Sequence, residues 1–147
     1  MKNENMNVVH IGEGKQTLSL VPKPPMYLSA AAKKYYLAMG KMLAKNERLK
    51  DIYLPALEIF ASAMDQFEYA SKAINLKNKE AAGTGFIQVY KTGATNITTE
   101  IVLRNNASDI LFKCFKQFGL DPKSESELKG LAETGQFDLF EQYLKVK

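Results

Sequence analysis

The feature that most constrains the fold is one long amphipathic stretch in the middle of the chain. From about residue 51 to about residue 76, side chains that can face a core recur every three or four residues, which is the spacing of one face of an α-helix. That face consists of Leu57, Phe60, Ala61, Met64, Phe67, Ser71 and Ile74. We expect Asp51 to cap this helix, and Pro55 falls in its first turn, where a proline costs little. A helix of about 25 residues is too long for one short neighbour to cover, so the pattern predicts a bundle or a subunit interface.

Two shorter helices flank the long one. Ser29 is a good N-cap for a helix that runs to about Lys45, with a stripe made of Ala32, Tyr35, Tyr36, Met39 and Leu43. Thr98 or Thr99 begins another helix, and Gly119 ends it. One face of that last helix carries Leu103, Ala107, Ile110, Leu111, Cys114, Phe115 and Phe118. The predicted fold is therefore mainly α, with a three-helix core.

Shorter segments complete the prediction. Residues 86–90 and 94–97 are β-prone and flank a turn at Thr92-Gly93, so we expect a small hairpin before the third helix. Residues 1–23 read as a flexible arm, in which Val8, Val9 and Ile11 could pair with Leu18, Leu20 and Val21 as short strands. Residues 24–123 form the predicted helical domain, and residues 124–147 form a tail with a short helix over 136–146.

Composition narrows the class of protein. A chain of 147 residues with 46% hydrophobic and 24% charged side chains suits one globular domain. The chain has no apolar run of about 18 residues or more, and its polar N-terminus does not look like a secretory signal. A single cysteine, Cys114, cannot form an intramolecular disulfide. These observations predict a cytoplasmic protein.

Residues for catalysis are scarce. One histidine, His10, and one cysteine cannot supply the four ligands of the usual zinc sites. The stretch around Lys15 fails the phosphate-loop pattern, because Gln16 follows the lysine and Val9 stands where a glycine is needed. Gly83-Thr84-Gly85 fails the dinucleotide pattern, because position 88 is a glutamine. We therefore predict no enzyme, no metal and no cofactor.

Charge is concentrated near the first helix. Residues 23–50 hold seven basic side chains and one acidic one, a local charge of +6, although the whole chain carries only +4. Such a segment is suited to contacts with nucleic-acid phosphates. The candidate DNA-binding residues are Lys23, Lys33, Lys34, Lys41, Lys45, Arg48, Lys50 and, on the hairpin, Lys91. For any one of them the alternative is a lysine that only keeps the surface soluble.

Four motifs, in order along the chain, resemble phage terminase small subunits. They are Pro24-Pro25 with Leu28-Ser29, Ala32-Lys33 and Tyr36; Asp51 with Pro55-Ala56-Leu57 and the long helix; the glycine-flanked hairpin; and the closing run Phe118-Gly119-Leu120-Asp121-Pro122-Lys123-Ser124. There are departures. The family often has Trp where this chain has Tyr36, a proline where Ile97 follows Asn96, and an arginine where Glu125 follows Ser124.

The resemblance implies a non-catalytic part of the DNA-packaging motor. Such proteins recognise double-stranded viral DNA, assemble into rings and deliver DNA to the large terminase subunit, in the host cytoplasm during phage assembly. For oligomer contacts we expect Leu57, Phe60, Met64 and Phe67. For docking of the large subunit or a ring neighbour we expect Phe137, Phe140, Tyr143 and Leu144.

Two other classes of protein remain open at this stage. A DNA-binding regulator could use the first two helices as a helix-turn-helix, but it would need a short recognition helix that carries base-reading side chains. The second helix here is too long and too acidic for that role. A structural head-completion or adaptor ring protein of a phage would also be small and oligomeric.

Overall fold

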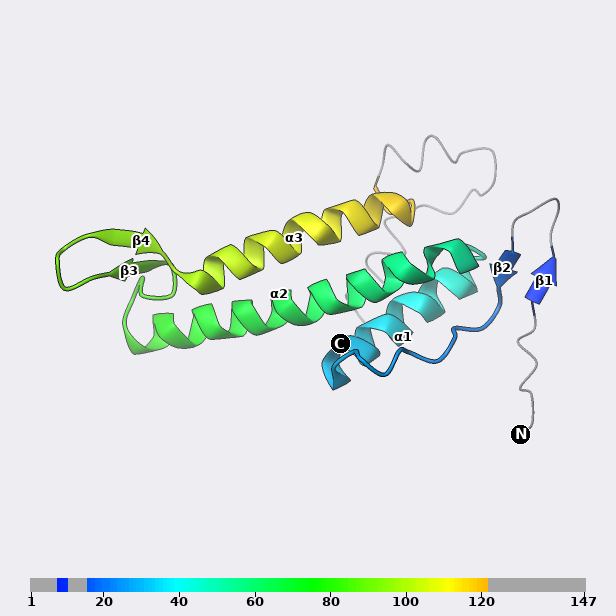
Figure 1. Cartoon of the computed structure of the whole chain (residues 1–147), viewed down its shortest axis with the longest axis horizontal. Coiled ribbons are helices and arrows are strands. Elements are labelled where there is room, and N and C mark those ends of the chain that lie inside the picture. The colour runs from blue at the N-terminus through cyan, green and yellow to red at the C-terminus, as the bar shows by residue number, and fades with distance from the viewer. Residues whose placement is uncertain (1–7, 11–15, 122–147) are drawn as a thin grey trace.

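Three α-helices, with a hairpin before the third, form the main body of the part of the chain that the structure describes (Figure 1). The computed structural model describes residues 8–10 and 16–121. Helices α1 (Ala30–Lys45), α2 (Leu54–Glu80) and α3 (Thr99–Gln117) follow one another, and an antiparallel hairpin of β3 (Ile87–Val89) and β4 (Thr95–Ile97) precedes α3. The mainly α fold and the hairpin are confirmed, whereas the helix expected over 136–146 lies outside the described residues.

Helix α1 begins at the predicted cap and ends in an unusual turn. The Ser29 hydroxyl accepts the backbone N–H of Ala32 at 3.0 Å, which confirms the predicted cap. At the other end, Glu47 adopts a φ of 56°, and the N–H of Arg48 reaches back to the carbonyl of Leu43 at 2.8 Å. A left-handed residue just past a helix is usually glycine, so Glu47 holds this turn at some conformational cost.

Helix α2 starts differently from the prediction. Asp51 opens a single 3-10 turn, η1 (Asp51–Tyr53), and its carboxylate accepts the N–H of Ile52, not one from α2. The residue that caps α2 is Tyr53, which makes no side-chain cap bond. The prediction that Asp51 caps the helix was wrong, because the backbone of the 3-10 turn supplies the acceptor and Pro55 has no N–H to satisfy.

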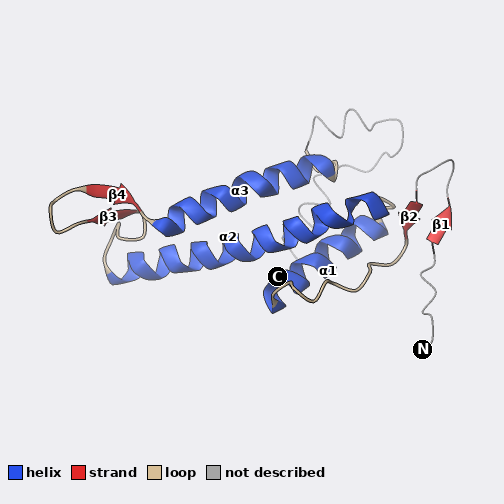
Figure 2. Ribbon diagram, viewed as in Figure 1, coloured by secondary structure: helices blue, strands red, loops and turns tan. Residues whose placement is uncertain are grey.

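The long helix lies in the middle of the molecule. Figure 2 shows α3 along one side of α2 and α1 alongside the first half of α2. The core sits where all three helices meet. There, Phe60 is fully buried, and its ring centre lies 6.0 Å from those of Phe115 and Phe118. Buried residues of α1, including Tyr36 and Leu43, close the core from the other side.

The segment that precedes α1, residues 19–29, lies along α1 as a strap. After strands β1 (Val8–His10) and β2 (Gln16–Leu18), which pair in the antiparallel sense as their sequence allowed, the chain runs back along α1 (Figure 1). Val21 packs on Gly40, where a Cβ would lie only 2.6 Å from the valine Cγ1. Leu18 is itself a core residue. The packed part of the chain therefore reaches back into the segment expected to be an arm.

Cys114 belongs to the core, in line with its place in the predicted stripe. Its thiol lies 3.8 Å from the carbonyl oxygen of Ala56, and burial raises the pKa of that thiol. It is a packed apolar residue with little thiolate character. Within residues 16–121, no helix has both the length and the apolar character needed to cross a membrane.

Candidate nucleic-acid interface

The strongest candidate interface is the outer face of α1. Lys34, Lys41 and Lys45 are spaced seven and four residues apart, so they lie within about 40° of one another around the helix. The buried residues Tyr36 and Leu43 point about 180° away, into the core. All three lysines are exposed. We call Lys34, Lys41 and Lys45 the α1 lysine face.

The other basic residues predicted from residues 23–50 differ in their exposure and in the contacts that they make. Lys23 is exposed on the strap, and Lys33 is half-buried. Arg48 donates from Nη1 to the carbonyl of Gly119 at 3.3 Å, which ties the α1–α2 turn to the end of α3. Lys50 places its ammonium 5.6 Å from the ring centre of Tyr53. Arg48 and Lys50 therefore contribute to packing as well as to charge.

Lys91 is not brought together with the other predicted residues. It sits in the turn of the β3–β4 hairpin, at the opposite end of the molecule from the C-terminus of α1 (Figure 1). Conversely, the contact of Arg48 with Gly119 puts the last turn of α3, and with it exposed Lys116, at the α1 end. Lys116 was missed because the sequence gives no local signal for a neighbourhood that only tertiary packing creates.

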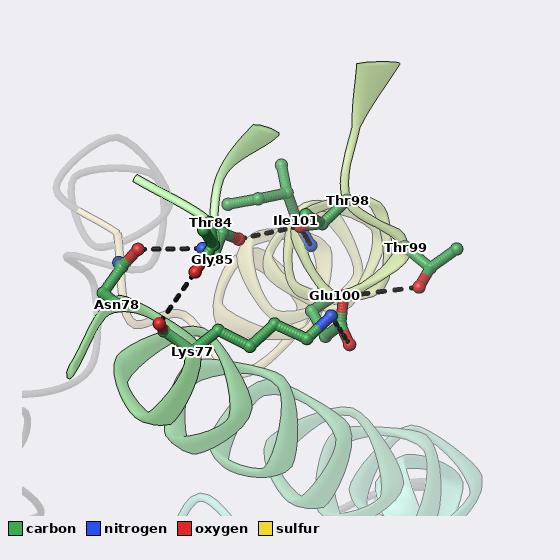
Figure 3. Close-up of polar contacts among 8 residues, drawn as sticks. All are labelled: Lys77, Asn78, Thr84, Gly85, Thr98, Thr99, Glu100 and Ile101. Atoms are coloured by element: carbon green, nitrogen blue, oxygen red, sulfur yellow. Dashed lines mark hydrogen bonds and ion pairs between the residues drawn. The ribbon is translucent and has the colours of Figure 1, made fainter. Parts of the chain in front are cut away.

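The hairpin that carries Lys91 is fixed to the helices by polar contacts at its base (Figure 3). The Thr84 hydroxyl donates to the Lys77 carbonyl at 2.7 Å, and the Asn78 side chain accepts the N–H of Gly85 at 2.8 Å. The buried hydroxyl of Thr98 donates to the Gly85 carbonyl at 2.7 Å while it also caps α3. These bonds set the direction in which the hairpin leaves the helices.

One ion pair strengthens the same junction. Lys77 Nζ lies 2.7 Å from Glu100 Oε1, and this pair joins the last turns of α2 to the first turn of α3 (Figure 3). The hydrogen bond from Lys77 is the main reason why the pKa of the Glu100 carboxyl is below its usual value. A carboxylate in the first turn of a helix also suits the positive end of the helix dipole.

Carboxylates of α2 gather at the seam between α1 and α2. Glu58 and Glu68 accept the hydroxyl protons of Tyr27 and Tyr35, and Asp65 accepts that of Ser29 at 2.6 Å. Burial, followed by the bond to Glu68, raises the pKa of the Tyr35 phenol, which therefore remains a neutral donor. These acids therefore contact Tyr35 and the residues just before α1, and none of the three bonds involves the α1 lysine face.

The residues predicted for oligomer contacts divide into two kinds. Leu57 and Phe60 are 0% exposed within a single chain, so in this conformation they have no surface to offer a neighbour. Their stripe faces the core because α1 and α3 both pack on that side of α2. Met64 and Phe67 are half-buried at the edge of the core. The predicted docking residues Phe137, Phe140, Tyr143 and Leu144 lie outside the described residues.

Comparison with known proteins adds the family. Residues 32–134 match the family described as phage terminase, small subunit, and this stretch covers most of the chain, including nearly all of α1 and the whole of α2, the hairpin and α3. A search of the curated proteins and a search of the solved structures each found no match. In the part of the chain that the structure describes, no three His, Cys, Asp or Glu side chains gather to hold a metal ion. The match shows that the chain belongs to the phage terminase small-subunit family.

Proposed function

We propose that this protein is the DNA-recognition component of a phage genome-packaging motor. It has no catalytic role, assembles into a ring, and presents viral DNA to the large terminase subunit in the host cytoplasm. The family match supports the packaging role. The observation that carries the DNA-binding part is the α1 lysine face, where Lys34, Lys41 and Lys45 point away from the core in one row.

The chemistry of this face suits the DNA backbone. A lysine ammonium is a compact charge on a flexible stem, and it binds a phosphate without a demand for planar geometry. Contacts of this kind fix position on the duplex but do not read its sequence. Lys23, Lys33, Arg48 and Lys50 are proposed as further phosphate contacts near this face in the sequence, and exposed Lys116 at the end of α3 is a candidate at the same end of the molecule.

Other parts of the chain have separate proposed roles. The hairpin lysine Lys91 is a second DNA contact, apart from α1. Met64 and Phe67 contribute to contacts between subunits, and the predicted helix over 136–146 docks the large subunit. None of these roles depends on the α1 lysine face, so an experiment can reject any one of them without affecting the rest.

The salt dependence of DNA binding tests the role of α1. Each phosphate contact adds about 0.9 to the slope of log K against log salt concentration. We expect Lys34→Gln/Lys41→Gln to lower that slope by about 1.8 and to weaken binding to any duplex sequence alike. The matched control is Arg104→Gln/Lys113→Gln on α3, which removes the same charge. Equal slopes for both double variants would refute the α1 site.

Light scattering coupled to size exclusion, with and without duplex DNA, tests the assembly. A ring that retains DNA supports the proposal. A monomer that ignores DNA at micromolar concentration contradicts it. A dimer bound to a single palindromic site would favour a regulator instead, and incorporation of the protein into finished virions would favour an adaptor.

A further inference from the structure

The β3–β4 hairpin has two faces of different chemistry. In its register, Gln88 lies directly opposite Asn96, and Ile87 lies directly opposite Ile97. Successive side chains of a strand point to opposite faces, so the two amides share one face and the two isoleucines share the other. We call the face that carries Gln88 and Asn96 the amide face.

Two aromatic residues border the amide face. The Tyr90 N–H donates to the Ala94 carbonyl at 2.9 Å, and at the other end the Thr98 N–H donates to the Phe86 carbonyl at 3.0 Å. The pairing therefore continues past both strands, and the alternation of faces puts Phe86 and Tyr90 on the side of Gln88. Phe86 is 48% exposed and Tyr90 is 46% exposed. The amide face is thus a short row with amides in the middle and a partly exposed aromatic side chain at each end.

The two amides are available to a ligand. Both side chains are exposed, and within the described part of the chain no hydrogen bond occupies the Gln88 amide. The Oδ1 atom of Asn96 accepts the N–H of Ile97 at 2.9 Å. That bond orients the Asn96 amide and leaves its NH2 group and one lone pair of its oxygen for other partners. Each amide can therefore donate and accept at the same time.

The charge of the hairpin suits a polyanion. Residues 81–99 contain no acidic side chain, and their one charged residue, Lys91, lies in the turn between β3 and β4. The amide face can therefore approach DNA phosphates without repulsion, and Lys91 adds an attractive contact at the tip. This charge pattern favours DNA as the occupant of the face.

We propose that the amide face reads base edges in the major groove of duplex DNA, with adenine as the favoured base. The major groove is about 12 Å wide and admits a two-stranded β-ribbon. An Asn or Gln amide binds adenine through two hydrogen bonds, because its NH2 group donates to N7 and its oxygen accepts from the N6 amino group. Residues directly opposite on two strands lie about 5 Å apart, and base pairs lie about 3.4 Å apart. Gln88 and Asn96 therefore reach the same base pair or adjacent ones.

The opposite face of the hairpin is less suited to this task. Ile87, Val89 and Ile97 are exposed there, but an aliphatic side chain offers neither a donor nor an acceptor. It can contact the methyl group of thymine, whereas base pairs differ mainly in their pattern of donors and acceptors. With the amide face on the bases, these apolar residues point out of the groove. A protein that docks on them is the competing use of the hairpin.

The polar base of the hairpin supports a reading role. Thr84 and Thr98 each donate a hydroxyl hydrogen bond of 2.7 Å to a backbone carbonyl, and the Asn78 side chain accepts the N–H of Gly85 (Figure 3). These bonds fix how the hairpin leaves the helices. An element that is already fixed loses less conformational freedom when it binds, so the amides can select bases at a lower cost in affinity.

This inference rests on the DNA-binding part of the proposed function and adds sequence selection to it. Phosphate contacts of the α1 lysine face position the protein on DNA but do not read its sequence. The hairpin, at the other end of the molecule (Figure 1), supplies the discrimination between sequences. Affinity and selection should therefore respond to different substitutions.

Selection from a pool of random-sequence duplexes tests this division. The wild-type protein should enrich one motif that contains adenine. Gln88→Ala/Asn96→Ala should bind the unselected pool as the wild type does, but its preference for the motif should fall at least about fivefold, because a bidentate contact supplies that much discrimination. The matched control, Ile87→Thr/Ile97→Thr, changes the opposite pair of the same hairpin and should enrich the motif normally. Loss of selection in the control, with selection kept in the amide variant, would overturn the inference.

A modified base tests the contact without a change to the protein. 7-Deazaadenine has a C–H in place of N7 and so removes that acceptor from the major groove. In the duplex that the wild type selects, we expect this replacement to weaken wild-type binding at one or two adenines and to leave binding of Gln88→Ala/Asn96→Ala unchanged. The result holds even if the double substitution disturbs the hairpin, because the wild-type protein is compared on two duplexes. No effect on wild-type binding at any adenine would overturn the inference.

The same measurements separate this inference from the proposed function. A wild-type protein that binds duplexes but enriches no sequence overturns the base-reading role and leaves the α1 lysine face as the DNA contact. A wild-type protein that binds no duplex even at low salt overturns both. Unchanged selection by the amide variant also overturns the base-reading role, and it would favour a protein as the partner of the hairpin.

Discussion

The two ends of the helical body use apolar side chains in opposite ways. At the α1 end, Leu57 and Phe60 are completely buried among three helices. At the hairpin end, Ile87, Val89 and Ile97 are each more than half exposed. The first end is held together by its core, whereas the second is held by hydrogen bonds and an ion pair at its base.

The contrast shows that the apolar residues that stabilise the fold differ from those that remain exposed at the surface. Burial of apolar area is the main stabilising term in a small domain, and here most of it comes from the α1 end. The hairpin contributes little burial, so its apolar residues remain free to contact something else. A polar base is then needed to keep the hairpin in one orientation.

The largest expected effect compares one substitution at each end. Phe60→Ala should lower the free energy of unfolding by about 3–5 kcal/mol, because it leaves a cavity in the core. Val89→Ala should change it by no more than about 0.5 kcal/mol, as is usual at the surface. Urea denaturation followed by circular dichroism measures both. Similar losses for the two variants would remove the distinction between the ends.

The next effect tests the polar base of the hairpin. Thr98→Val keeps the shape of the side chain but removes the α3 cap and the bond to the Gly85 carbonyl, and should cost about 1–2 kcal/mol. Hydrogen exchange should rise in β3 and β4 more than in α1. Thr98→Ser retains the hydroxyl and should restore most of the protection. Uniformly faster exchange across all elements would mean that the base is not a local anchor.

A smaller effect with the opposite sign is expected at the end of α1. Glu47 has a φ of 56°, where glycine carries no steric penalty. Glu47→Gly should therefore stabilise the protein by about 0.5–1 kcal/mol, seen as a higher urea midpoint. At the hairpin end, Gly93 has a φ of 85°, and Gly93→Ala should be destabilising. A destabilised Glu47→Gly protein would show that the glutamate makes a contact that compensates for its backbone.

The smallest effect concerns pH. Because the folded-state pKa of Glu100 is lowered from 4.5, its pairing with Lys77 stabilises the fold above that value, and this contribution is lost as pH falls through the lower folded pKa. Glu100→Gln should thus be less stable than wild type at pH 7, with a gap that closes in acid. Urea midpoints at several pH values give the comparison. A gap that stays constant throughout the acid range would contradict the ion-pair explanation.

Local signals in the sequence predicted the elements well, for physical reasons that act over a few residues. Ser29 and Thr98 cap their helices as expected, and Gly119 follows α3 with a φ of 69°. The hairpin follows from its β-prone segments and its turn. Asp51 failed as a cap because the 3-10 turn before Pro55 offers a backbone acceptor instead.

The site was harder to predict because it depends on packing. The α1 lysines could be placed on an outer face from helix geometry alone. The sequence could not show that Lys116 lies at the α1 end of the molecule and Lys91 at the other end. Their positions relative to α1 depend on how α3 and the hairpin pack. The apolar face of α2 was predicted to face either a bundle or a subunit interface, and for Leu57 and Phe60 the structure shows the bundle, because α1 and α3 cover them.

Lysine footprinting tests the central claim, that the α1 lysine face binds DNA. The native protein is treated with an amine-reactive acetylating reagent, with and without duplex DNA, and each lysine is quantified by mass spectrometry. We predict strong protection of Lys34, Lys41 and Lys45 by DNA, with exposed Lys113 modified equally in both samples. Equal modification of the three α1 lysines in the presence and absence of bound DNA would contradict the claim.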